Sequence, residues 1–147
     1  MNLVALIEEA KAKHDWSVLG AAIPYAQFLG ISADDSTGEL LGKMAYTPSL
    51  IGNAGIPALH GGTLGALLES TAIFQLLYEA ETIVLPRTIT ITVDYLRSGR
   101  PVDTYARGTI TRQGRRVASV HVVAWQDDRE RPIATANAHV LITPADE

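Results

Sequence analysis

The chain has 147 residues, of which 47% are hydrophobic and 19% are charged, a size and balance typical of one folded domain with a single core. It has no cysteine, which excludes disulfides and thiol catalysis, and no apolar run reaches the ~18 residues of a membrane span. A net charge of −4 argues against a nucleic-acid partner, and the lack of a secretion signal at the N-terminus predicts a cytoplasmic protein.

The first half of the chain reads as helix, loop, strand, loop and helix. An amphipathic helix is predicted over roughly residues 2–14, and residues 24–36 are expected to be irregular or a short strand. Residues 39–46 are a plausible first long strand. A stretch rich in Gly, Pro and Asn then indicates a loop. It leads into a long apolar helix over about residues 61–81.

After this helix the hydrophobic period changes from 3.6 to 2 residues, which indicates strands. The alternation in residues 88–96 predicts Ile89, Ile91, Val93 and Tyr95 on one face, with Thr88, Thr90, Thr92 and Asp94 on the other. Residues 104–112 and 116–125 flank a hairpin turn at Gln113-Gly114, and residues 133–143 form the last strand. Four strands in a meander are therefore expected, in an α+β domain with an antiparallel sheet. Small inner-face residues in the last two strands predict a sheet wrapped closely around the long helix.

Glu69 is the only ionisable residue between Gly62 and Tyr78, in a helix that is apolar nearly all round. Such a helix is expected in a protein interior. Burying a charged carboxylate costs several kcal/mol unless it is paired, hydrogen-bonded or protonated. Carboxylates kept in apolar clefts often act as general bases or nucleophiles. The alternative is a structural glutamate that caps a neighbouring backbone or points into water at an interface.

The sequence His60-Gly61-Gly62 stands where the chain enters this helix. Backbone N–H groups at a helix N-terminus favour negative charge, so the turn is a candidate oxyanion hole for a thioester or ester carbonyl. A plain glycine-rich loop is the alternative. Gly61 and Glu69 are eight residues apart, or ~12 Å along one helix, which is too far to serve one reacting carbonyl. An active site here therefore implies a two-fold dimer, with Gly61 of one chain facing Glu69 of the other.

Two stretches, NAGIPALHGGTLGALLE and TITITVDYLRSGRPVDTYARGTITRQGRRVASVHVVAW, resemble the hotdog-fold acyl-CoA thioesterases, in the branch typified by the phenylacetate-degradation thioesterase. The resemblance runs from about Gly38 to Ile142 of a single domain over residues 1–147, with residues 1–37 as a less typical N-terminal extension. It implies a hotdog fold, in which an antiparallel sheet of five to six strands wraps around a long central helix. It also implies homodimers and often homotetramers.

The resemblance further implies hydrolysis of acyl-CoA thioesters without metal or cofactor, CoA being part of the substrate. Carried over by position, Glu69 is the nucleophile or general base. The amide of Gly61 is the main oxyanion donor with Gly62 beside it, and His60 helps to hold the turn. Asn53 matches a residue that orients substrate or water, although it precedes His60 by seven positions instead of the usual ~six that the resemblance implies.

Four further positions are implied to meet the substrate. Thr88 matches a position that often carries a hydroxyl near the catalytic acid. Arg97, Arg112 and Arg115 are candidates for contacts with the CoA phosphates, because guanidinium groups bind phosphate in a bidentate manner.

Two other functions stay open at this point. A hotdog enoyl-CoA hydratase or dehydratase needs a histidine and an acid together, and His60 and Glu69 could meet only across a dimer. A non-catalytic acyl-CoA-binding protein would keep the fold but gain nothing from Glu69 on an apolar helix. The four histidines do not pair at metal-ligand spacing, so no metal site is expected.

Overall fold

The computed structural model describes residues 2–144. The elements in chain order are α1 (Leu3–Lys13), α2 (Ser17–Ala22), α3 (Pro24–Leu29), β1 (Ile31–Asp34), β2 (Leu41–Met44), a 3₁₀ turn (Pro48–Leu50), β3 (Ile51–Asn53), β4 (Ile56–Leu59), α4 (Gly61–Glu79), β5 (Val84–Tyr95), β6 (Thr104–Gln113), β7 (Val117–Trp125) and β8 (Ala134–Pro144). Among these residues, no helix combines the length and hydropathy needed to cross a bilayer.

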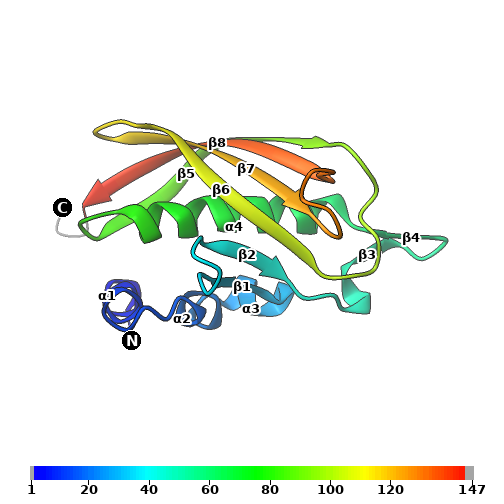
Figure 1. The fold of residues 1–147 in the computed structure, drawn as a ribbon, viewed down its shortest axis with the longest axis horizontal. Coiled ribbons are helices and arrows are strands. Elements are labelled where there is room, and N and C mark those ends of the chain that lie inside the picture. The colour runs from blue at the N-terminus through cyan, green and yellow to red at the C-terminus, as the bar shows by residue number, and fades with distance from the viewer. Residues whose placement is uncertain (1, 145–147) are drawn as a thin grey trace.

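Six antiparallel strands form one curled sheet in the order β1-β2-β6-β7-β8-β5, and α4 lies in its concave side (Figure 1). This arrangement confirms the predicted α+β hotdog architecture. The predicted four-strand meander is wrong for β5, which pairs with β8 instead of β6. Alternation identifies a strand but not its neighbour, and the connection after β5 crosses the end of the sheet to reach β6 (Figure 1). As a result β5 is an edge strand.

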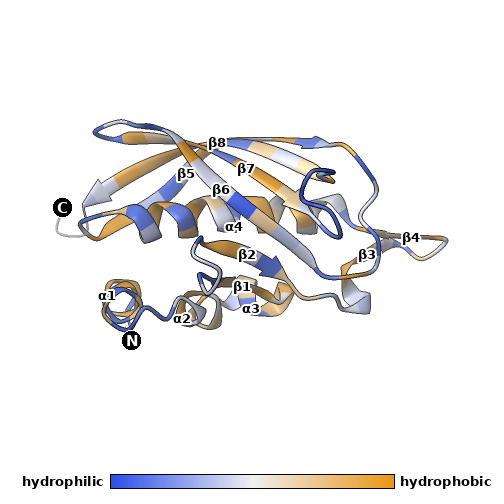
Figure 2. Ribbon diagram, in the orientation of Figure 1, coloured by the Kyte–Doolittle hydropathy of each residue, from blue (hydrophilic) through white to orange (hydrophobic). Residues whose placement is uncertain are grey.

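Small residues set the close approach of helix and sheet, as predicted. Ala106, Ala118, Ala124, Ala134, Ala136 and Ala138 are all buried on the inner face. At Gly42 a Cβ atom would come within 2.1 Å of the Thr71 hydroxyl oxygen of α4, a distance that real Cβ atoms do not reach. The orange inner strands and helix in Figure 2 mark this core. Burial of this surface is the main favourable contribution to folding.

The N-terminal part contains more helix than expected. The helix predicted at residues 2–14 is α1, capped by the Asn2 side chain. The segment expected to be irregular or a short strand contains the short strand β1, but it begins with α3, because Pro24 starts a helical turn and Gly30, at φ 71°, ends it in the left-handed region. The Lys11 ammonium group donates a hydrogen bond to the carbonyl of Ala80 at the C-terminus of α4. This contact ties α1 to the central helix and matches its dipole.

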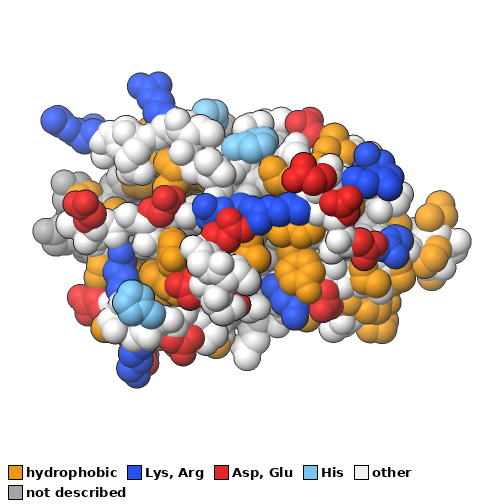
Figure 3. Space-filling model, in the orientation of Figure 1, with side chains coloured by type: hydrophobic (Ala, Val, Ile, Leu, Met, Phe, Trp, Pro, Cys, Tyr) orange, Lys and Arg blue, Asp and Glu red, His pale blue; other side chains and the backbone are white. Residues whose placement is uncertain are grey.

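The loop expected before the central helix contains the short β3–β4 hairpin, which protrudes at the end of the molecule where α4 begins (Figure 1). Exposed hydrophobic side chains gather on this protruding end (Figure 3), where Ile56 is 63% exposed. The same end carries the β5–β6 connection and the β7–β8 turn, while the β6–β7 hairpin and the C-terminus of α4 lie at the opposite end (Figure 1).

Candidate functional site

The turn that opens α4 is built around His60. Its backbone N–H donates to the carbonyl of Leu50 at 2.8 Å, and its Nδ1 accepts from the amide of Gly62 at 2.9 Å. His60 is therefore the N-cap residue of the helix. The amide of Gly62 is already engaged, whereas the amide of Gly61 has no acceptor among residues 2–144. Of the two glycines proposed as oxyanion donors, only Gly61 has a free N–H group.

Tyr95, which sequence reasoning gave no role, holds the same glycine from the other side. Its hydroxyl donates to the carbonyl of Gly61 at 2.8 Å, and a Cβ atom on Gly61 would lie 3.2 Å from the tyrosine ring. Any other residue at this position would require the ring to move back by a few tenths of an ångström. The signal was present in the sequence, because alternation places Tyr95 on the face that turns toward the helix.

Replacing Tyr95 with Phe is expected to lower the free energy of unfolding by about 0.5–1 kcal/mol, because it removes one neutral hydrogen bond at a side chain that water reaches. The melting temperature should fall by roughly 1–4 °C, as judged by thermal unfolding followed by circular dichroism. Tyr25→Phe is the matched control, since Tyr25 is 61% exposed on α3. Equal melting temperatures for the two variants would show that the Tyr95 hydroxyl does not stabilise the turn.

Glu69 lies in the third turn of α4, on a face that the rest of the chain leaves partly open. The apolar sequence predicted a helix buried on every side, but the structure leaves one stripe of it partly open. Its half-buried or exposed stripe consists of Gly62, Gly65, Ala66, Glu69, Ser70 and Ile73. Within the described chain, Glu69 accepts no hydrogen bond and makes no ion pair. Its environment therefore depends on what covers this stripe.

Glu39, in contrast to Glu69, is a carboxylate with a structural role. Glu39 accepts from Arg129 and pairs with Arg107 at 3.5 Å. The hydrogen bond from Arg129 holds the pKa of Glu39 below its ordinary value. Glu69 has no arginine or lysine of this kind beside it, so the structural interpretation of Glu69 as a capping or paired residue lacks a partner in the described chain.

β5 runs beside the open stripe of α4 and differs from its predicted alternation. A β-bulge between Thr88 and Thr90 shifts the register against β8. Thr88 pairs with Val140 on the inner face, and Ile89 becomes 54% exposed. The prediction that Thr88 faces away from Ile91 is wrong, because the extra residue of a bulge reverses the alternation. The Thr88 hydroxyl therefore lies on the same face of the sheet as α4.

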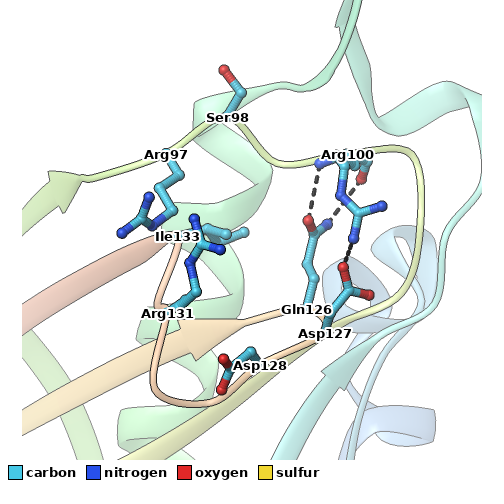
Figure 4. A pocket seen from close by; sticks show the side chains of 8 residues that line it. All are labelled: Arg97, Ser98, Arg100, Gln126, Asp127, Asp128, Arg131 and Ile133. Carbon is cyan, nitrogen blue, oxygen red and sulfur yellow. Dashed lines mark hydrogen bonds and ion pairs between the residues drawn. The ribbon is translucent and has the colours of Figure 1, made fainter.

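The remaining predicted site residues divide between the two ends of the molecule. Asn53 ends β3 and is exposed, and its side-chain oxygen accepts from the amide of Gly55 at 2.9 Å. It therefore shapes the hairpin turn near the start of α4. Arg97 also lies at this end, beyond β5, where Figure 4 shows its side chain. Arg112 and Arg115 lie at the β6–β7 hairpin, at the opposite end from Gly61 of their own chain (Figure 1).

One groove connects several of these groups. It has a volume of about 400 Å³ and is lined by Ala58, Leu59, Gly61, Leu64, Tyr95, Leu96, Arg97, Ser98 and Gly99. The single chain thus brings together Gly61, Tyr95 and Arg97. It does not place Glu69 in this groove, and the roles predicted for the individual site residues stay predictions.

Comparison with protein families finds that residues 57–133 match the family model described as "Thioesterase superfamily". A solved structure of a protein from Chromobacterium violaceum is 38% identical, with 93% of this chain and 96% of that chain covered and a TM-score of 0.74. A second, from Ralstonia eutropha, is described as a thioesterase and phenylacetic acid degradation-related protein. It is 25% identical, with 81% and 90% covered and a TM-score of 0.69. A thioesterase from Haemophilus influenzae, at 18% identity and a TM-score of 0.73, shares the fold. A comparison with curated proteins gave no match.

Proposed function

Because the chain belongs to the thioesterase superfamily, we propose that it hydrolyses acyl-CoA thioesters to a free acid and CoA. Membership in the superfamily supports thioester hydrolysis in general. The acyl-CoA substrate, the roles of the site residues and the dimer go beyond membership and are proposed on the arguments that follow. The observation that carries the proposal is that, among residues 2–144, the Glu69 carboxylate and the Gly61 amide on the same helix both lack a partner, since thioester hydrolysis requires both a base or nucleophile and a donor to the carbonyl oxygen.

The two groups are most simply combined by a two-fold dimer. Glu69 lies eight residues, or ~12 Å, along α4 from Gly61. A second, antiparallel copy of α4 on the open stripe would place Gly61 of one chain opposite Glu69 of the other. The small residues Gly62, Gly65 and Ala66 on that stripe allow a close approach. Such packing would also remove water from Glu69.

The edge strand supports the same dimer. β5 has 12 residues, longer than most strands, and its outer backbone groups are unpaired within the described chain. A long edge strand with unpaired backbone groups is a template for pairing with another chain. Ile89 and Tyr95, which are 54% and 56% exposed, would be covered if β5 paired with its own copy. We therefore propose a homodimer, which can associate further into a tetramer.

In this site the thioester carbonyl oxygen accepts from the amide of Gly61, at the positive end of the α4 dipole. Two routes then lead to products. Glu69 of the partner subunit takes a proton from water while the water oxygen attacks the carbonyl carbon, or its carboxylate attacks directly and the resulting anhydride is hydrolysed. In either route the C–S bond breaks and the thiolate leaves as CoA, with a proton supplied from solvent. No metal or cofactor is needed for this chemistry.

The test is thiol release measured over a panel of acyl-CoA thioesters that includes apolar chains and aromatic acyl groups. We expect turnover of at least one of these substrates by the purified homodimer. Tight binding without turnover across the whole panel would favour an acyl-CoA-binding protein. Addition of water to an enoyl-CoA, seen as loss of the conjugated double bond, would favour the hydratase.

A further inference from the structure

A second cavity adjoins the groove at Gly61 and is rich in arginine. It has a volume of about 220 Å³ and is lined by Arg97, Ser98, Arg100, Gln126, Asp127, Asp128, Arg131 and Ile133. These residues come from the β5–β6 connection and the β7–β8 turn, which meet at the end of the sheet (Figure 4). Arg97 and Ser98 line both this cavity and the groove that contains Gly61. The two are therefore neighbours that share part of their walls.

The cavity is held in shape by its own hydrogen bonds. The amides of Leu96 and Arg97 both donate to the carbonyl of Ile133, at 2.8 and 3.1 Å. The side chain of Gln126 accepts from the Arg100 amide at 3.0 Å and donates to the Arg100 carbonyl at 2.9 Å. These bonds fasten the β5–β6 connection to the β7–β8 turn. The backbones that carry the arginines of the two loops are thus held relative to each other before any ligand binds.

The three arginines of the cavity differ in their partners. Arg100 forms an ion pair with Asp127. Arg97 and Arg131 form no ion pair within residues 2–144. Arg97 and Arg131 line the same cavity, and in Figure 4 the Asp127 carboxylate turns toward Arg100. Two neighbouring guanidinium groups repel each other unless an anion lies between them.

We propose that Arg97 and Arg131 form a phosphate-binding subsite for the nucleotide end of a CoA thioester. This inference rests on the proposed function. When the carbonyl lies at Gly61, the neutral pantetheine arm follows a groove lined by Leu59, Leu64 and Leu96. The arm then reaches the arginine pair, where phosphate oxygens accept from both guanidinium groups. Arg131 has no role in the hydrolysis itself, and it distinguishes substrates that carry phosphate from those that do not.

The experiment compares one acyl group on CoA and on pantetheine, which lacks every phosphate. For Arg97→Gln/Arg131→Gln we expect kcat/KM for the acyl-CoA to fall by ~10²-fold, mainly through KM, because two charge-assisted contacts are lost. For the acyl-pantetheine, kcat/KM should stay within about twofold of wild type. The control is Lys13→Gln/Lys43→Gln, which also removes two positive charges, from exposed side chains outside the cavity, and should leave both substrates unaffected. The same comparison of kcat/KM with acyl-dephospho-CoA, which lacks only the 3′-phosphate, and with acyl-phosphopantetheine, which keeps one phosphate on the pantetheine arm, then identifies which phosphate the two arginines bind.

An equal loss on both substrates, or no loss on the CoA ester, would overturn the subsite. The proposed function is tested separately by the wild-type protein, which should hydrolyse the acyl-pantetheine without help from the arginines. If wild type hydrolyses neither ester, titration with free CoA in a calorimeter still tests the subsite, which predicts ~10²-fold weaker binding to the double variant. Equal CoA affinity of wild type and double variant in that titration would refute it.

Discussion

Replacing Glu69 with Gln is expected to lower kcat for acyl-CoA hydrolysis by at least ~10²-fold with KM changed little. The amide of Gln keeps the size of the side chain and removes its ability to accept a proton or attack a carbonyl. The open stripe of α4 tolerates the substitution, because Glu69 has no ion pair or hydrogen bond in the described chain to lose. The measurement is steady-state thiol release at saturating and limiting substrate.

Glu8→Gln serves as the matched control, since Glu8 is exposed on α1 and forms no ion pair among the described residues. Both variants should unfold at nearly the same temperature. Turnover of Glu69→Gln at the rate of Glu8→Gln would show that Glu69 is not the catalytic group. A single turnover in H₂¹⁸O then tests direct attack in wild type, because water that opens the anhydride at the Glu69 carbonyl leaves the label in the Glu69 carboxylate, whereas the general-base route places it only in the product acid.

Hydrophobic period and small residues predicted an antiparallel sheet wrapped around the long helix that carries the candidate site, and the family resemblance implied that this is a hotdog fold. Inner-face alanines such as Ala136 and Ala138 are buried as alternation required. Strand neighbours were harder to predict, since β5 pairs with β8 through contacts distant in sequence. The bulge at Ile89 was also hidden, because one extra residue in a strand leaves no composition signal.

The site was predictable in its residue types and less so in its contacts. Which amide of the Gly61-Gly62 pair is free could not be read from the sequence, because it depends on the rotamer of His60, whose Nδ1 accepts from Gly62. The role of Tyr95 required knowing that β5 ends beside the start of α4. That Arg97 and Arg131 line one cavity depends on two loops 34 positions apart in the numbering that meet at one end of the sheet.

A mixture of two inactive variants is expected to recover activity if each site is shared between chains. Glu69→Gln keeps its Gly61 turn, and Gly61→Val keeps its carboxylate but presses a branched side chain against Tyr95, whose ring would already lie 3.2 Å from a Cβ atom. In a heterodimer, one site combines Gly61 of the first chain with Glu69 of the second and is intact. The other site carries both changes. A purified heterodimer should therefore show about half of wild-type activity, and a random 1:1 mixture about one quarter.

The recovery separates a shared site from one built within a single chain, because no chain in the mixture carries both groups. Each variant refolded with itself is the control and should stay near its parent rate, at least ~10²-fold below wild type. If Gly61→Val fails to fold, Gly61→Ala places one Cβ atom against the same ring and tests the turn with a smaller disturbance. Activity of the purified heterodimer no higher than that of its parents would place the carbonyl donor and the carboxylate in one chain. The dimeric site proposed here would then be wrong, even if the protein hydrolyses thioesters.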